Sequence, residues 1–379
     1  MRIAFLTTDH RDGIPGCTDP QPRIGYAPGA LLQGFDGLAG AEVHIISCLK
    51  EPMHSVKTIA PNIFYHAAVV PSWGWLKGAY LGCIQSVRRI IANIEPDIVH
   101  GQGTERFAAI AAAFSGKPAV ITIHGNMRAV ARKMGANPLS FHWLTARLEE
   151  FTVPRVEGVV CLSRYAQDQV AGLARKTWVI QNAVSKQFFD VAPAKASCPT
   201  LLCVARVCSY KNQVNLIRAL DPLADRIPFR LTFAGDADLT TDYGREFAKL
   251  VAQRPWCEHI GYVEGESLRK LYAESTLLVL PSLEDNCPMA ALESAAAGVP
   301  IAASNIGGIP DLISEGENGV LFDPSKPEEM RNKIAALLIN PVQLASMAAR
   351  AKSRALARNL PTVVATEHLK IYEEVLKSR

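Results

Sequence analysis

A strand end, an acidic loop and a helix follow one another in Pro281-Ser-Leu-Glu-Asp-Asn-Cys-Pro-Met-Ala-Ala-Leu-Glu-Ser-Ala-Ala-Ala-Gly-Val-Pro300, the stretch that decides the fold. The apolar run Thr276–Leu280 directly before it is typical of a buried parallel strand. Pro288 favours the first turn of a helix, and Gly298 followed by Pro300 ends that helix. The strand is therefore expected to bring its carboxylates to the start of a helix.

Carboxylates flank this helix start. Asp285 precedes the helix, with Glu284 directly before it. Glu293 lies inside the helix, and seven residues separate it from Asp285. Carboxylates accept hydrogen bonds from sugar hydroxyls, while the free N–H groups and the dipole of a helix start attract an anion. A nucleotide-sugar carries both kinds of group and suits this arrangement. The alternative interpretation is that the acids only cap the helix and lie on its surface.

The spacing of the two acids resembles the acidic-pair motif (Glu, seven residues, Glu) of the family-4 retaining glycosyltransferases, also called glycosyltransferase group 1. The variant it resembles reads Glu-Asp-Asn-x-Pro before the helix. Asp285 stands where the family usually has its first Glu, and Glu293 keeps the second position. The resemblance covers nearly the whole chain and implies the α/β fold called GT-B, in which two doubly wound Rossmann-like domains face each other across a cleft.

Length and composition fit such a two-domain enzyme. The 379 residues exceed what one hydrophobic core usually supports. The sequence begins as a first strand rather than as a secretory signal, and it contains no apolar run long enough to span a membrane. The nine cysteines are scattered without a Cys-x-x-Cys pair, which indicates buried thiols in a reducing compartment. We expect a cytoplasmic protein that can lie at the inner face of the membrane.

Apolar runs alternate with helical patterns along the chain, which predicts parallel sheets. This rhythm is lost over residues 183–199, where Pro, Ala and Ser are enriched, and we place a linker there. We expect a Rossmann-like acceptor-side domain over 1–182 and a Rossmann-like nucleotide-sugar domain over 200–361. The resemblance implies that the last helix, about 362–379, crosses back to the first domain. The expected strands are Ile3–Leu6, Val43–Ser47, Asp97–His100, Ala119–Ile123, Gly158–Leu162 and Trp178–Ile180, then Leu201–Ala205, Arg230–Ala234, His259–Val263, Leu277–Leu280, Val299–Ala303 and Val320–Phe322.

A second group of residues supports a nucleotide-sugar site in the C-terminal half. Arg206 ends an apolar run and Lys211 follows it just before a helical pattern, so the two cations can flank a diphosphate. The pair resembles the Arg and Lys of the family, whose charge stabilises a departing nucleoside diphosphate. The turn at Gly235 resembles the Gly-Asp-Gly turn of the family, although Ala237 replaces the second glycine. The donor-binding residues that the resemblance implies are Gly235, Asp236, Tyr262, Val263, Glu284, Asn286, Cys287, Met289 and Glu293.

In the N-terminal half, His124 ends a strand pattern and is followed by a glycine. The segment resembles the Thr-x-His-Asp/Gly motif of the family, whose His approaches the donor sugar. A structural histidine is the alternative. The long first loop and the segment 97–105 are expected to form an acceptor or phosphate loop, although the usual glycine doublet is missing from the first loop. The residues assigned to this loop site are Gly25, Tyr26, His100, Gln102 and Glu105.

The net charge of +4 is too small to indicate a nucleic-acid-binding protein, and no nucleic-acid-binding motif is present. Arg128, Arg132 and Lys133 nevertheless cluster in the N-terminal half. Arg147 follows further on, and the same half contains Trp73, Trp75 and Trp143. A basic, aromatic half suits an anionic membrane surface or a lipid-diphosphate acceptor. A solvated helix face is the alternative.

The resemblance implies that the chain moves a hexosyl or other sugar from a nucleoside-diphosphate donor to a hydroxyl acceptor, with retention of the anomeric configuration. The acceptor is a saccharide, a lipid-linked glycan or a small molecule, as in glycan and polysaccharide biosynthesis. His124, Arg206, Lys211 and Asp285 are the expected catalytic residues. We expect no metal and no cofactor other than the donor. Two alternatives stay open at this point: a nucleotide-sugar 2-epimerase of similar fold, and a non-catalytic nucleotide-sugar-binding protein.

Overall fold

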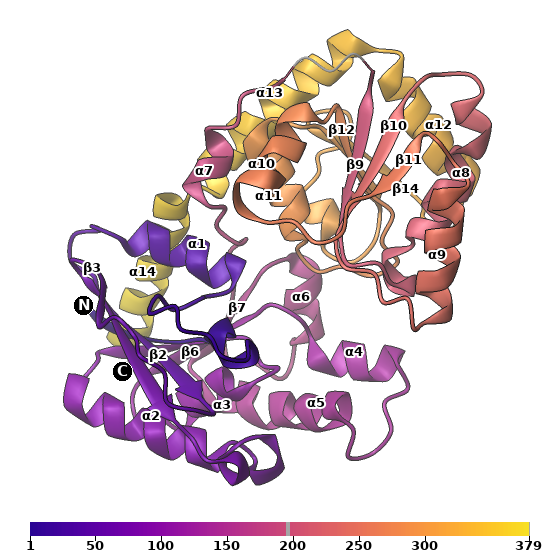
Figure 1. Cartoon of the computed structure of the whole chain (residues 1–379). Helices are drawn as coiled ribbons and strands as arrows, with labels where there is room; N and C mark the ends of the chain where they lie inside the picture. The colour runs from indigo at the N-terminus through magenta and orange to yellow at the C-terminus, as the bar shows by residue number, and fades with distance from the viewer. Residues whose placement is uncertain (195–197, 379) are drawn as a thin grey trace. The chain divides into compact units, whose positions relative to one another are not determined.

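The computed structural model describes residues 1–194 and 198–378. Residues 195–197 of the expected linker and Arg379 of the expected last helix lie outside the described residues. The chain divides into two compact units, one made of residues 1–183 and 361–379 and the other of residues 184–360 (Figure 1). Residues 184–194, where the sequence indicates a linker, therefore belong to the second unit.

The first unit is built on a sheet with the strand order β3-β4-β2-β1-β5-β6-β7-β8, in which only the β3–β4 pair is antiparallel. β3 and β4 were not expected from the sequence. β3 has no buried residue, and buried positions alternate with more exposed ones along β4, because this edge of the sheet is partly exposed. The strands are β1 (Arg2–Leu6), β2 (Glu42–Leu49), β3 (Thr58–Ala60), β4 (Ile63–Val69), β5 (Ile98–Gln102), β6 (Ala119–Ile123), β7 (Gly158–Cys161) and β8 (Thr177–Val179).

Helices cover both faces of this sheet. Ile3 and Phe5 of β1 pack in the core that contains α1 and α14, while Ala4 and Leu6 pack in the core that contains α2 and α3. α14 follows the whole second unit in sequence, yet it packs on α1 (Figure 1). The contact is so close that a Cβ atom on Gly34 of α1 would lie 2.0 Å from the carbonyl oxygen of Pro361. The helices are α1 (Tyr26–Phe35), α2 (Leu81–Ile94), α3 (Phe107–Ala113), α4 (Met127–Lys133), α5 (Phe141–Thr152), α6 (Arg164–Gln169) and α14 (Pro361–Lys377).

The second unit contains a fully parallel sheet with the strand order β11-β10-β9-β12-β13-β14. One expected strand is corrected: the strand predicted over His259–Val263 is Cys257–His259, because Gly261 has a φ of +74° and turns the chain out of the sheet. The strands are β9 (Thr200–Val204), β10 (Arg230–Ala234), β11 (Cys257–His259), β12 (Leu277–Leu280), β13 (Ile301–Ser304) and β14 (Gly319–Phe322). The helices are α7 (Lys186–Phe189), α8 (Gln213–Ala224), α9 (Asp242–Ala252), α10 (Gly265–Glu274), α11 (Met289–Ala297), α12 (Pro327–Leu338) and α13 (Pro341–Arg358).

Among the described helices, none taken singly has both the length and the apolar character needed to cross a membrane. One bent pair, Pro327–Leu338 with Pro341–Lys377, meets these requirements by length and composition alone.

Candidate active site

The acidic loop of the second unit joins β12 to α11 as the sequence predicts. β12 ends at Leu280, and α11 begins at Met289 with Pro288 as its N-cap residue. Among the described residues, no side chain caps this helix start. The N–H groups of Ala291 and Leu292 donate to the carbonyl oxygen of Pro288, over 3.0 and 3.4 Å, so the N–H groups of Met289 and Ala290 are the ones that can bind an anion. At the other end, Gly298 takes a left-handed conformation with a φ of +75° and ends the helix.

Lys211 and Asp285, two residues expected to bind different parts of a donor, contact each other directly. The Nζ atom of Lys211 donates to Oδ2 of Asp285 over 2.5 Å, and both side chains are largely buried. The hydroxyl of Ser282 also donates to Oδ2, over 3.4 Å. Because a lysine ammonium has three donors, two of them remain for a phosphate after the contact with Asp285. The ion pair thus positions the ammonium close to the acidic loop.

The Gly307–Gly308 loop holds the backbone of Asp285, a role that the sequence did not reveal. The N–H of Gly308 donates to the carbonyl oxygen of Asp285 over 3.0 Å. A Cβ atom on Gly307 would lie 2.1 Å from the same oxygen, and Gly307 has a φ of +55°. Only glycine satisfies both conditions. The glycine doublet is the sequence signal that could have identified this support.

Glu293 is buried beneath the acidic loop, with 5% of its surface exposed. The hydroxyl of Tyr272 lies 3.2 Å from Oε2 of Glu293 and 3.1 Å from the carbonyl oxygen of Ala290, so its single proton is shared between two acceptors. Burial raises the pKa of Glu293 to about 7, although the contact with Tyr272 opposes this shift. Tyr272 was missed by the sequence analysis because its pairing with Glu293 depends on the packing of α10 against α11.

Arg206 follows β9 and is exposed. In the described ranges 1–194 and 198–378, its guanidinium forms neither an ion pair nor a hydrogen bond, while its carbonyl oxygen accepts from the Nε2 of Gln213 over 2.9 Å. The backbone of Arg206 is thus fixed at the strand end. Its charge remains available to a ligand.

Gly235 allows three strand ends to meet. A Cβ atom on Gly235 would lie 2.1 Å from the carbonyl oxygen of Ala205, and its φ is +147°. Its N–H donates to Gly261 over 2.7 Å, and its carbonyl oxygen accepts from Nε2 of His259 over 2.7 Å. The loop after β11 also carries Tyr262, whose exposed ring places its hydroxyl 2.9 Å from Glu264. Of the remaining expected donor residues, Cys287 is buried, Val263, Glu284, Asn286 and Met289 are partly exposed, and Asp236 is exposed.

The expectation that no metal is needed has to account for Asp236 and Asp238, which have the Asp-x-Asp spacing of a metal motif. Both side chains are exposed, and Oδ1 of Asp238 already accepts from the N–H and the hydroxyl of Thr240, over 2.9 and 2.6 Å. These hydrogen bonds lower the pKa of Asp238. Within the described part of the chain, no group of three or more His, Cys, Asp or Glu residues is arranged to hold a metal ion.

A chain of hydrogen bonds in the first unit connects the expected histidine to the core. Nε2 of His124 lies 2.9 Å from Oε1 of Gln102, and the amide nitrogen of Gln102 lies 3.1 Å from Nε2 of His100. His100 itself contacts the hydroxyls of Tyr372, over 2.6 Å, and Thr122, over 2.8 Å. The assignment of His100 to the acceptor loop is corrected, because this side chain is fully buried and supports the residues above it.

His124 is neutral at physiological pH. Part of its surface is exposed, yet the protein packed around it and the nearby His368 lower its pKa to about 4. If Gln102 is oriented with its oxygen toward His124, the proton of the imidazole lies on Nε2. His124 therefore acts as a hydrogen-bonding group rather than as a cation.

A buried ion pair organises the long first loop. Arg11 and Asp9 are both fully buried, and Nη2 of Arg11 donates to Oδ2 of Asp9 over 2.7 Å. Asp9 also accepts from the N–H of Arg23 and the hydroxyl of Tyr65, over 3.1 and 2.7 Å. This network fixes the loop up to Gly25, the N-cap of α1, next to which Tyr26 is 52% exposed. The charged residues directly after the first apolar run were the overlooked sequence signal.

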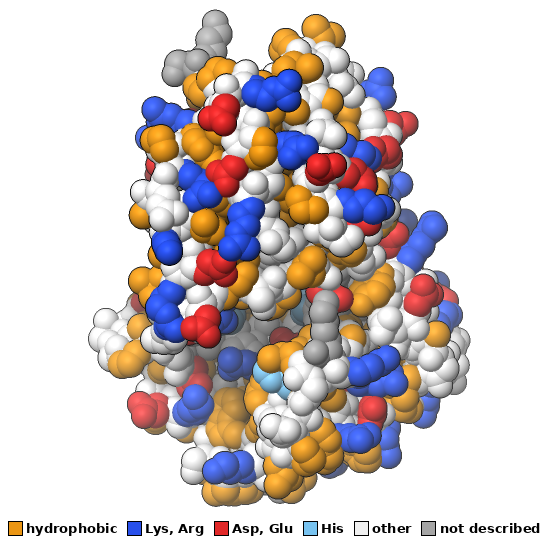
Figure 2. Space-filling model, turned by 90° about the vertical axis from the view of Figure 1, so that its right-hand side faces the viewer, with side chains coloured by type: hydrophobic (Ala, Val, Ile, Leu, Met, Phe, Trp, Pro, Cys, Tyr) orange, Lys and Arg blue, Asp and Glu red, His pale blue; other side chains and the backbone are white. Residues whose placement is uncertain are grey.

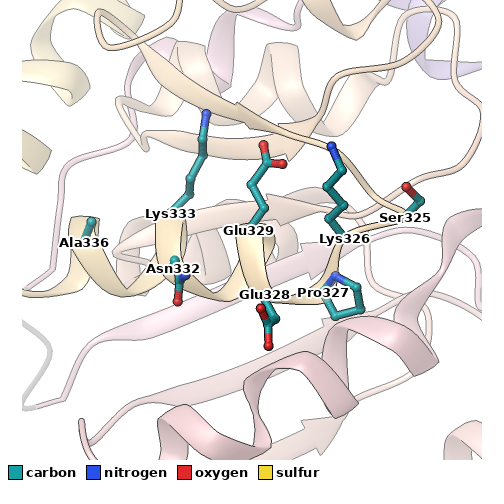
Figure 3. A pocket seen from close by; sticks show the side chains of 8 residues that line it. All are labelled: Ser325, Lys326, Pro327, Glu328, Glu329, Asn332, Lys333 and Ala336. Atoms are coloured by element: carbon teal, nitrogen blue, oxygen red, sulfur yellow. The ribbon is translucent and has the colours of Figure 1, made fainter.

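A surface pocket of about 770 Å³ lies elsewhere, at the start of α12 (Figure 3). Figure 3 shows Lys326, Glu329 and Lys333 extending to the same side of this helix. Lys333 pairs with Glu315 over 2.8 Å and Lys326 with Asp323 over 3.2 Å. The pocket contains none of the expected site residues, and its two lysines already have partners.

Comparisons with known proteins cover both units. Residues 30–188 match the family model described as Glycosyltransferase Family 4, and residues 185–354 match the model described as Glycosyl transferases group 1. The chain is 23% identical to the 2-deoxystreptamine glucosyltransferase of Streptomyces kanamyceticus over 340 residues, which cover 84% of this chain and 86% of that protein. It is 32% identical to an uncharacterized glycosyltransferase of Methanocaldococcus jannaschii over 130 residues, but this match spans only 34% of this chain and 33% of that protein.

Two solved structures show the same fold. The sucrose-phosphate synthase of Thermosynechococcus elongatus superimposes with a TM-score of 0.77 at 17% identity, covering 100% of both chains. The Anabaena protein HepE, solved in complex with UDP-glucose, superimposes with a TM-score of 0.70 at 18% identity, again over 100% of both chains. The expected fold class, two Rossmann-like α/β domains of the GT-B type, is confirmed.

The raised pKa of Glu293 predicts a stability that depends on pH. Between the unfolded value of 4.5 and the folded value of about 7, the folded protein keeps a proton that the unfolded chain has lost. The free energy of unfolding should therefore fall as the pH rises through this window, by up to about 3 kcal/mol. Urea unfolding at pH 5 and pH 8 measures this loss.

Glu293→Gln should remove most of the pH-dependent loss of stability, whereas Glu266→Gln, at an exposed position of α10, should not. Equal losses in wild type and Glu293→Gln would refute the assignment.

Proposed function

The chain belongs to the group 1 glycosyltransferases of family 4, and we propose that it transfers a sugar from a nucleoside-diphosphate donor to an acceptor hydroxyl with retention of configuration. The observation that carries the proposal is the Lys211–Asp285 pair beside the uncapped start of α11. It combines a cation, a carboxylate and helix N–H groups within one loop system. A nucleotide-sugar presents the matching phosphate and hydroxyl groups.

The diphosphate is proposed to bind between Arg206, Lys211 and the first turn of α11. Arg206 contributes a guanidinium that has no protein partner in the described ranges, and Lys211 contributes its two remaining donors. Negative charge grows on the leaving diphosphate as the glycosidic bond breaks, so these cations stabilise the transition state more than the ground state. The structures of HepE in complex with UDP and UDP-glucose make UDP the first nucleotide to test.

The sugar and the ribose are proposed to bind through the acidic loop. Asp285 and Glu284 accept from sugar hydroxyls, with the backbone of Asn286, Cys287 and Met289 completing the site. Pro288 cannot donate. Glu293 is proposed to accept from the ribose, and Tyr262 and Val263 to provide backbone contacts to the base. His124, neutral because of its lowered pKa, is proposed to orient the substrate by a hydrogen bond.

Retention is proposed to proceed by attack on the face that the diphosphate leaves. The bond between the anomeric carbon and the phosphate oxygen breaks, and the acceptor oxygen forms its bond to the same carbon on the same face. The acceptor proton passes to an oxygen of the departing phosphate. This route needs no covalent intermediate, in contrast to retaining glycosidases that use a carboxylate nucleophile.

Contact with a membrane surface is proposed for the region of α4 and α5. A surface cavity of about 550 Å³ is lined by residues that include Arg128, Arg132, Trp143 and Arg147. Arg147 lies over the ring of Trp143, with 5.4 Å between its guanidinium carbon and the ring centroid. The exposed hydrophobic residues nearby in the chain are Met134, Leu139 and Phe141. Arginines beside exposed hydrophobic side chains suit the headgroups and the upper acyl chains of anionic lipids, and hence a lipid-linked acceptor. On the face drawn in Figure 2, basic, acidic and hydrophobic side chains lie next to one another.

Nucleotide binding tests the phosphate site. UDP should raise the melting temperature of the wild type, with GDP, ADP, dTDP and CMP as comparisons, since a ligand at about 100 times its dissociation constant stabilises a fold by roughly 2.7 kcal/mol. Arg206→Ala should melt like the wild type without ligand, lose the nucleotide shift and lower transfer about 100-fold. Arg245→Ala, which removes an exposed cation of α9, is the matched control. Normal turnover in Arg206→Ala would contradict the proposal. Conversion of the donor in the absence of an acceptor would instead favour a 2-epimerase.

Metal independence is proposed for the same reaction, since Arg206 and Lys211 provide the positive charge that the diphosphate needs. Transfer should continue at an unchanged rate after dialysis against EDTA. Asp236→Asn combined with Asp238→Asn should then have the same EDTA response as the wild type. The proposal would be contradicted if EDTA abolished the activity of the wild type and Mn²⁺ restored it. If Mn²⁺ then failed to restore activity in the double variant, the two aspartates would be the residues that hold the metal.

Membrane contact predicts binding to anionic vesicles only. The protein should sediment with vesicles of phosphatidylcholine and phosphatidylglycerol, but not with phosphatidylcholine alone, and 0.5 M NaCl should release it because salt screens exposed charges. Arg132→Ala with Arg147→Ala should weaken sedimentation, while Arg218→Ala with Arg245→Ala, in the second unit, should not. Equal binding to both kinds of vesicle would contradict an electrostatic contact.

A further inference from the structure

The centre of the first sheet is the point at which a ligand is expected in this type of fold. β1 and β5 are neighbours, with Leu6 opposite Gly101. The helix after β1 packs on one face of the sheet and the helix after β5 packs on the other, as their separate cores show. The two loops therefore leave in opposite directions, and ligands of doubly wound sheets bind outside the carboxyl ends of strands at such a point.

Glu105 lies in the loop after β5 at this point. Its carboxylate is folded over Gly103, where an added Cβ atom would lie 2.5 Å from each carboxylate oxygen. In the part of the chain that the structure describes, Oε2 of Glu105 is buried and has no hydrogen-bond partner. The residue as a whole is only partly buried. The nearby N–H groups of Thr104 and Glu105 offset the effect of burial only in part, and the pKa of Glu105 is raised.

Glu149, a second buried glutamate of the same unit, has hydrogen-bond donors for its carboxylate oxygens and serves as a comparison. Glu149 is fully buried, and Oε2 accepts from the hydroxyl of Thr104 over 2.5 Å and from the N–H of Met127 over 3.0 Å. Oε1 faces the N–H of Arg128 over 3.3 Å. Glu149 thereby ties the loop after β5 to the start of α4. Glu105 has no comparable set of donors, and leaving a buried charged group unpaired is costly.

The neighbours of Glu105 define the kind of ligand that could satisfy it. Arg106 is exposed, and its charge reaches both Glu105 and His10. The ring of His10 lies against Gly25, with 3.2 Å between Nε2 and the position of an added Cβ. Burial and the charge of Arg106 lower the pKa of His10, so this ring is neutral and can donate or accept. The cation disfavours an ammonium ligand, whereas hydroxyl groups suit a carboxylate beside a neutral imidazole.

We propose that Glu105 binds the acceptor by accepting a hydrogen bond from a hydroxyl of a neutral polyol, with His10 contacting a neighbouring hydroxyl. The proposal rests on the proposed glycosyl transfer and adds the acceptor class and the residues that hold it. Glu105 is then a binding residue that is kept at a cost to the stability of the free protein, whereas Glu149 is a positioning residue.

Thermal melting of the ligand-free protein compares the two glutamates. Glu105→Met removes an unpaired carboxylate and should raise the melting temperature by about 2–4 °C. Glu149→Met leaves three donors without an acceptor and should lower it by at least as much. A drop in Glu105→Met as large as that in Glu149→Met would show that the carboxylate is structural and would overturn the proposal.

Kinetics test the acceptor role with UDP-glucose as donor and with D-glucose, myo-inositol and n-octyl β-D-glucopyranoside as polyol acceptors. Glu105→Met should raise the acceptor KM at least tenfold, and Glu105→Gln should raise it less. Both variants should keep the UDP-induced melting shift and the rate of donor hydrolysis in water.

An unchanged acceptor KM, or a loss of donor hydrolysis as large as the loss of transfer, would overturn the assignment of Glu105. Donor hydrolysis without transfer to any of the three polyols would overturn the ligand class. Absence of a UDP shift and of hydrolysis in the wild type would instead count against the proposed donor, and the melting comparison would still decide whether Glu105 is structural.

Discussion

The central strands of both sheets are buried on their two faces, and this constraint determines where polar chemistry can occur. Residues 3–6 of β1 alternate between two separate cores, so neither face of this part of the strand can carry a charged group. Groups that must meet a charged ligand are therefore found near the carboxyl ends of the strands. Arg206 after β9, Asp285 after β12 and His124 after β6 all follow this rule, which is why a strand assignment also indicates where the candidate site lies.

The sequence predicts those elements whose signal is local. The apolar run before Pro281 and the glycine after Ala297 define β12 and the end of α11 without any tertiary information. β3 and β4 were missed because they form a partly exposed edge of the sheet, where β3 has no buried residue and only alternate residues of β4 are buried. The strand expected through Val263 ends at His259, since the hydrophobic pattern does not reveal the positive φ of Gly261.

The pairings within the candidate site could not be predicted, because they join residues that are far apart in the chain. Lys211 meets Asp285 across 74 residues, and His100 meets Tyr372 across 272. The same residue type also takes different roles according to its surroundings. Glu293 shares the proton of one tyrosine, Glu149 has three donors, and Glu105 has a buried oxygen with none among the described residues. Burial of this kind is a property of packing, which the sequence does not show.

The close contact of α1 with α14 has a consequence for the order in which the protein is made. The first unit needs residues 361–377 to cover the face of its sheet on which α1 lies, but the ribosome completes the whole second unit before it reaches them. During synthesis, the backbone beside Gly34 and neighbouring apolar residues such as Phe35 therefore remain uncovered until α14 has been made. The first unit can therefore complete this face only after α14 has been made.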